Sequence, residues 1–91
     1  MSRTCLQFEC VTTGIWAGLI LNGEPVTLVH GRGAVEVDAH QVIDLIVQVL
    51  GREGDTVTVR CFKGGHSHIL FDKAEIPRGQ AKMVCQCKFT S

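Results

Sequence analysis

The alternation of apolar and polar side chains restricts the fold of this chain more than any other feature, and it is strictest near the C-terminus. One row of residues 80–90 contains Ala81, Met83, Cys85, Cys87 and Phe89. The other row contains Lys82, Val84, Gln86, Lys88 and Thr90. Because successive side chains of a strand point to opposite faces, this spacing predicts a β-strand with one face toward a core.

Shorter runs predict further strands over 4–12, 15–21, 56–62 and 68–72. Asn22-Gly23 is typical of a two-residue hairpin turn, so we expect the chain to return through Val26–His30. The glycine-rich segment 31–37 predicts a bend followed by a short strand. Within these strands we expect Trp16, Ile69 and Phe71 to point into the core.

One segment, residues 39–52, has the spacing of a helix. Asp38 and Gln41 form a D-x-x-Q capping-box pattern, and Gly54 follows as an end signal. The apolar residues recur at helical spacing and would form one stripe: Val42, Ile43, Leu45, Ile46, Val49 and Leu50.

These elements together predict an α+β fold, with one antiparallel sheet of five to six strands and one helix packed on one face, in the order βββ–α–βββ. Residues 1–91 are expected to form a single domain. The sheet face away from the helix would be polar and basic, since it would collect Thr58, Arg60, Lys82, Gln86 and Lys88, with His66 and His68 at its margin.

Charge is unevenly distributed along a chain whose net charge is zero. Residues 1–55 carry three basic and seven acidic side chains, and residues 56–91 carry six basic and two acidic ones. Such asymmetry indicates a surface for a phosphate backbone or an acidic protein patch. Five cysteines without a C-x-x-C pair, and the lack of an export signal or a long apolar run, predict reduced thiols in the cytoplasm.

The stretch KGGHSHILF, residues 63–71, comes nearest to a chemical motif. His66-x-His68 and Cys85-x-Cys87 could together make a zinc site if their strands were neighbours. The alternation opposes this, because the cysteines fall in the apolar row of their strand and the histidines fall out of phase with Ile69 and Phe71. We therefore expect no metal. We also expect no cofactor, because the sequence has no phosphate-binding loop. It has no nucleophile elbow either, which argues against a catalytic serine.

Residues 42–77 resemble the HicA toxin family. The shared pattern is a helix over VIDLIVQVLGREG, a strand with Arg60, the turn Lys63-Gly64-Gly65-His66 and the dipeptide Ile76-Pro77. The family has a serine where this chain has Gly65. The resemblance implies a small ribonuclease in which His66 is the general acid–base and Arg60 and Lys63 hold phosphate.

In size and build the whole chain also resembles the small phage-encoded anti-CRISPR proteins, which are commonly single domains without enzymatic motifs. This resemblance implies a non-enzymatic, cytoplasmic inhibitor that covers a nucleic-acid-binding surface of a host defence complex. Its partner would be a protein or a ribonucleoprotein, with contact to the RNA backbone. The expected partner-binding residues are Arg32, Arg60, Lys63, His66, His68, Lys82 and Lys88. A homodimer that pairs through a sheet edge is a further alternative.

Overall fold

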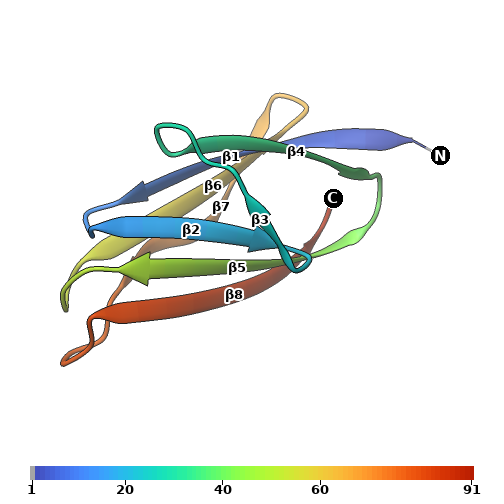
Figure 1. The fold of residues 1–91 in the computed structure, drawn as a ribbon. Coiled ribbons are helices and arrows are strands. Elements are labelled where there is room, and N and C mark those ends of the chain that lie inside the picture. The colour runs from blue at the N-terminus through green and yellow to red at the C-terminus, as the bar shows by residue number, and fades with distance from the viewer. Residues whose placement is uncertain (1) are drawn as a thin grey trace.

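The computed structural model describes residues 2–91 as eight β-strands in two antiparallel sheets, shown in Figure 1. Sheet A has the order β4-β1-β6-β7, and sheet B has the order β3-β2-β5-β8. The strands are β1 Arg3–Thr12, β2 Trp16–Leu21, β3 Glu24–Val26, β4 Arg32–Asp38, β5 Val42–Leu50, β6 Thr56–Lys63, β7 His66–Glu75 and β8 Lys82–Thr90. Residues 2–91 contain no helix, so the predicted α+β fold is wrong and the protein is an all-β sandwich.

The segment predicted as a helix is β5, the strand between β2 and β8 in sheet B. Its buried side chains alternate strictly: Ile43, Leu45, Val47 and Val49 are each fully buried. The residues at 42–50 satisfy both periodicities, but valine and isoleucine are stiff at χ1 and favour a pleated strand.

The predicted capping pair exists without a helix. The Gln41 side chain accepts a hydrogen bond from the Asp38 N–H at 3.3 Å, as a capping box requires. His40, between them, has a φ of 63°, in the left-handed region. Because a right-handed helix cannot begin through that conformation, the pair closes the turn between β4 and β5 instead.

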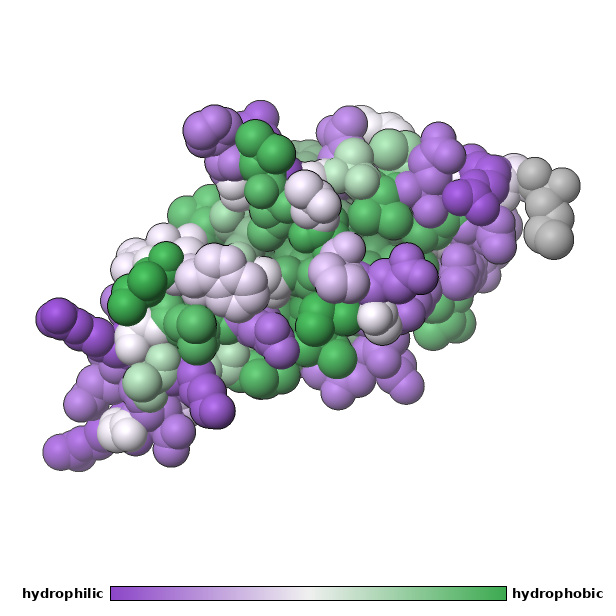
Figure 2. All heavy atoms as spheres, in the orientation of Figure 1, coloured by the Kyte–Doolittle hydropathy of each residue, from purple (hydrophilic) through white to green (hydrophobic). Residues whose placement is uncertain are grey.

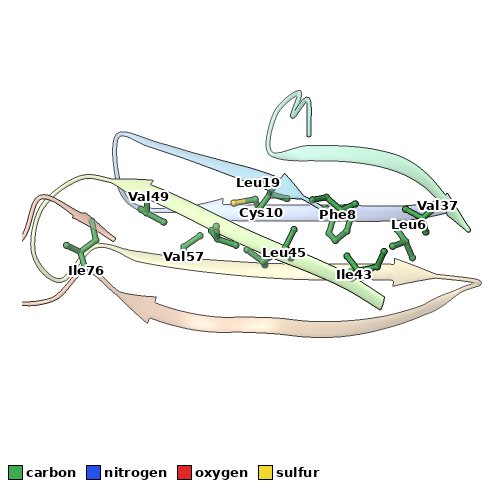
Figure 3. Close-up of a cluster of buried hydrophobic side chains, with 14 residues drawn as sticks. Leu6, Phe8, Cys10, Leu19, Val37, Ile43, Leu45, Val49, Val57 and Ile76 are labelled. Atoms are coloured by element: carbon green, nitrogen blue, oxygen red, sulfur yellow. The ribbon is translucent and has the colours of Figure 1, made fainter. Parts of the chain in front are cut away.

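The core lies between the two sheets. Figure 3 shows its side chains pointing toward one another from both layers. The largest fully buried ones are Phe8, Leu6, Leu19, Ile43, Leu45, Ile76, Val47, Val49, Val57 and Val59. Each sheet thus buries one face and leaves the other in water, which explains the period-two pattern along the chain.

The strand predicted over 80–90 is confirmed as β8, and its faces are as expected. Met83, Cys85, Cys87 and Phe89 pack against the core but remain partly exposed. The Asn22-Gly23 turn is also confirmed, with positive φ at both residues and Leu21 paired to Glu24. The return strand is shorter than predicted, because β3 ends at Val26 and residues 27–31 form a loop.

Strand β7 departs from simple alternation. Its pairing with β6 shifts between Val57 and Val59 and again between Val59 and Arg60. Phe71 still packs against the core, but Ile69 is 54% exposed, so its predicted inward position is wrong. A β-bulge adds one residue to a strand, so the side chains beyond it point to the opposite sheet face from the one that simple alternation predicts. Sequence spacing alone does not reveal such a bulge.

The predicted core position of Trp16 is wrong as well. It pairs with Leu50 and is 49% exposed on the outer face of sheet B. Its ring lies over Gly18, where an added Cβ would come within 2.4 Å of the indole.

No helix within residues 2–91 could cross a membrane.

Candidate functional site

Two of the predicted partner-binding residues converge on one carboxylate on the outer face of sheet A. Glu9 of β1 lies opposite Arg32 of β4 on one side and Arg60 of β6 on the other. An Arg32 guanidinium nitrogen lies 3.3 Å from a Glu9 oxygen, and an Arg60 nitrogen lies 3.4 Å from the other oxygen. We call these three residues the arginine cluster.

The arginine cluster keeps unused binding capacity. The Arg32 and Arg60 side chains are 77% and 44% exposed, whereas Glu9 is only 21% exposed. Each guanidinium has five N–H donors, and Glu9 engages one nitrogen of each. With two positive charges and one negative charge, the cluster can still hold an anion such as a phosphate or a carboxylate.

A hollow of about 540 Å³ adjoins the arginine cluster on the same face. Its lining comes from three neighbouring strands: Gln7, Phe8, Glu9, Arg32, Gly33, Ala34 and Phe62. The small residues of β4 leave the space, and the half-buried Phe62 of β6 lies in the same row as Gln7 and Ala34. The surface therefore combines cationic groups with an aromatic ring, which suits a phosphate carried next to a flat group.

The predicted residues Lys63, His66 and His68 lie elsewhere, in the β6–β7 hairpin. Gly64 and Gly65 both have positive φ and form its two-residue turn, so Lys63 pairs with His66 and Cys61 pairs with His68. Directly opposed residues share a face, so the two histidines stand on the same side of sheet A as the buried Cys61. The expectation that they lie on the face away from the core is therefore wrong, because of the bulges in β7.

A cleft of about 300 Å³ opens between the sheets beside this hairpin, and Lys63 and His68 line it together with Phe89. His66 and His68 are exposed. Within residues 2–91, no group of three or more His, Cys, Asp or Glu side chains is placed to hold a metal ion.

Lys82 and Lys88 are on β8 and point outward from sheet B, whereas Arg60 points outward from sheet A. The single basic sheet face predicted from the sequence is therefore wrong, since its members lie on opposite sides of the sandwich. Lys88 is opposite Asp44 of β5, and that carboxylate accepts a hydrogen bond from the Gln86 amide at 2.8 Å.

The outer face of sheet B is more apolar than the sequence suggested. Figure 2 shows hydrophobic side chains gathered over the central strands and hydrophilic ones at both ends. Its exposed apolar members on the three strands are Trp16 at 49%, Val42 at 63%, Leu50 at 44% and Val84 at 64%. The signal was present at Leu50, which points away from the core once 42–50 is taken as a strand.

Four of the five cysteines are poorly suited to nucleophilic chemistry. Burial raises the pKa of the Cys10, Cys61, Cys85 and Cys87 thiols, and nearby Lys63 offsets only part of this effect on the pKa of Cys61. A thiol with a raised pKa is mostly protonated near neutral pH, and the protonated form is a poor nucleophile.

Of the seven predicted partner-binding residues, the structure brings Arg32 and Arg60 together at Glu9, and Lys63, His66 and His68 together at one hairpin. It leaves Lys82 and Lys88 on the other sheet. No protein-family model matches the chain, and no curated protein or solved structure matches it either.

Proposed function

We propose that this protein is a non-enzymatic binding module that inhibits a larger ribonucleoprotein, in the manner of an anti-CRISPR protein. It acts by covering a nucleic-acid-binding surface, with the outer face of sheet A against the partner. The observation that carries the proposal is the arginine cluster, in which strands far apart in sequence present two guanidiniums beside an aromatic hollow.

The energetics of the cluster favour a binding role over a structural one. Exposed ion pairs contribute only about 0–1 kcal/mol to folding. Strongly exposed guanidiniums beside Glu9 therefore add little to stability, but they can form charge-assisted hydrogen bonds to the phosphates of a partner's RNA. One flanking aromatic, Phe62, is a small platform for stacking, so we expect the body of the complex to supply most of the contact area.

The alternative is a ribonuclease that uses His66. The HicA-type resemblance needs a helix over residues 42–54, where the structure has β5 and the turn that follows it. His66 also lies in the β6–β7 hairpin, whereas Arg60 faces outward beside Glu9. A general acid–base needs a phosphate held within its reach, and of the two expected phosphate-holding residues only Lys63, which pairs with His66, lies beside it.

The test begins by isolating the tagged protein from a bacterial host lysate and identifying the bound protein and RNA. Affinity for the isolated complex is then measured for Arg32→Gln/Arg60→Gln and for Lys82→Gln/Lys88→Gln. Both variants lose two positive charges, but only the first changes the arginine cluster. We expect the first to weaken binding at least tenfold and the second less than threefold, with a reduced salt dependence for the first.

Equal weakening by both variants would show that net charge alone matters and would contradict a specific role for the arginine cluster. Weakening that persists after the RNA is digested would place the guanidiniums on an acidic protein patch instead. Cleavage of RNA by the wild type and not by His66→Ala would replace the inhibitor by the nuclease alternative.

A further inference from the structure

The two sheets end in four edge strands, β4 and β7 in sheet A and β3 and β8 in sheet B. An edge strand carries unpaired backbone N–H and C=O groups, which another strand can join. Folded proteins usually block such edges by shortening, bulging or covering them. The four edges of this sandwich differ in how far they are blocked. This difference indicates a second interaction surface, separate from the face of sheet A on which the proposed function depends.

Three of the four edges are shortened, interrupted or already paired over part of their length. Strand β3 has three residues with Pro25 in the middle, and proline has no N–H to donate. The start of β4 is already paired with its own loop, since the Val29 N–H donates to the Arg32 carbonyl at 2.8 Å and the return bond is 3.1 Å. Strand β7 is interrupted by two register shifts, and Lys73 in it has a left-handed φ of 51°.

The fourth edge, β8, is open. It pairs with β5 without a break from Lys82 opposite Leu50 to Thr90 opposite Val42. None of residues 2–91 pairs with it on the other side, where it forms the lower border of the molecule in Figure 1. Its inward row of Met83, Cys85, Cys87 and Phe89 is only partly buried. The edge therefore offers hydrogen-bonding groups and incompletely covered apolar side chains together.

We infer that two copies of this chain associate antiparallel along β8, with a two-fold axis at Gln86, and so join their two B sheets into one. Gln86 is the midpoint of Lys82–Thr90, so this register pairs the strand over its full length. On the inner side, Met83 lies opposite the partner's Phe89, and Cys85 lies opposite the partner's Cys87. Each half-covered apolar side chain thereby gains an apolar neighbour.

The lysines of β8 favour the axis at Gln86 over an axis at Cys85. With the axis at Cys85, Lys82 would lie opposite the partner's Lys88, and directly opposed like charges are destabilising. With the axis at Gln86, Lys82 lies opposite the partner's Thr90, and Lys88 lies opposite the partner's Val84. Lys88 also keeps Asp44 of its own chain beside it. The arrangement opposes no two charges of the same sign.

Substitution at Val84 tests the association in solution. Val84 is 64% exposed, so changing it should leave the fold of one copy intact. By light scattering at rising concentration, we expect the reduced wild type to reach twice the mass of one chain. Val84→Lys, which faces the partner's Lys88, should shift the dissociation constant at least tenfold upward. Val84→Glu, which attracts that lysine, should preserve or tighten the dimer.

Val11→Lys is the matched control, since it makes the same change on β1 of sheet A at a comparably exposed position, 56%. It should leave the mass unchanged. A wild type that stays a monomer at millimolar concentration would overturn the proposal. Equal dissociation by Val84→Lys and Val11→Lys would also overturn it.

Cysteine cross-linking tests the register. Opposed residues of an antiparallel pair have Cα atoms about 4.5–5.5 Å apart, within the range that a disulfide spans. In a Cys5→Ser background, diamide should cross-link neither Cys85→Ser alone nor Cys87→Ser alone. An equal mixture of the two should cross-link, because one chain supplies Cys87 and the other Cys85. Cross-linking of one variant by itself, or none in the mixture, would contradict the axis at Gln86.

Discussion

At the scale of single residues, the informative position is Glu9. Its side chain is more buried than either arginine that contacts it, and its two oxygens are divided between Arg32 and Arg60. A shared carboxylate of this kind holds two guanidiniums at a fixed separation, while it cancels one of their two charges. Glu9 therefore positions the arginine cluster and limits its affinity for anions at the same time.

Replacing Glu9 separates these two effects. We expect Glu9→Gln to lower the free energy of unfolding by less than about 1 kcal/mol, since exposed ion pairs contribute little. Binding to heparin at low ionic strength should become stronger, because both guanidiniums are freed. Glu24→Gln makes the same change in net charge at the exposed end of β3 and should alter elution less. An equal rise in the eluting salt concentration for both variants would show that the position of the charge is irrelevant.

At the scale of elements, β5 shows where sequence periodicity fails. Its apolar residues fit a helical stripe and an alternating strand equally well, and the D-x-x-Q pattern before it forms its Asp38–Gln41 hydrogen bond in a turn rather than at a helix start. The neighbouring strands determine that this segment is a strand, because β2 and β8 pair with it on both sides and supply hydrogen-bond partners for its backbone. Such long-range pairing is invisible in a local window of sequence.

Two adjacent positions of β5 distinguish the strand from the predicted helix. Val47 is fully buried in the structure but lies off the predicted helical stripe, whereas Ile46 lies on that stripe but points outward. We expect Val47→Ala to lower the free energy of unfolding by about 2–3 kcal/mol and Ile46→Ala by about 1 kcal/mol or less. Urea denaturation measures both. The reverse order of the two losses would favour the helix.

The strands with regular alternation or a clear turn could be predicted from the sequence, as β8 and the Asn22-Gly23 turn demonstrate. The candidate site could be predicted only in part. The sequence indicates that Arg32 and Arg60 are basic surface residues, but their meeting at Glu9 depends on β1 lying between β4 and β6. Simple alternation places the two histidines on the wrong face, because the bulges in β7 shift its register and no residue pattern in the sequence predicts those bulges.

At the scale of the whole molecule, one core serves both sheets, and four of the five cysteines contact it. Cys10 and Cys61 come from sheet A, and Cys85 and Cys87 come from sheet B. Burial raises the pKa of all four thiols. The folded state therefore keeps the four thiol protons at a pH where the unfolded chain releases them. Thiols of both sheets thus make the free energy of unfolding depend on pH in the same direction.

The sign of that response follows from proton linkage. Unfolded cysteines titrate around their usual pKa of about 8.5, whereas the folded thiols titrate higher. Below that pH both states hold the protons and the contribution to stability is complete. Above it the unfolded state binds fewer protons, so stability falls as the pH rises. We expect the urea midpoint to be flat from about pH 7 to about pH 8 and to decline toward about pH 9.5.

Cys10→Ala should make this decline shallower. Val59→Ala, which empties the buried position paired with Cys10, should lower the midpoint at every pH without changing the slope. A decline of the same steepness in both variants would mean that the buried thiols do not govern the alkaline limit.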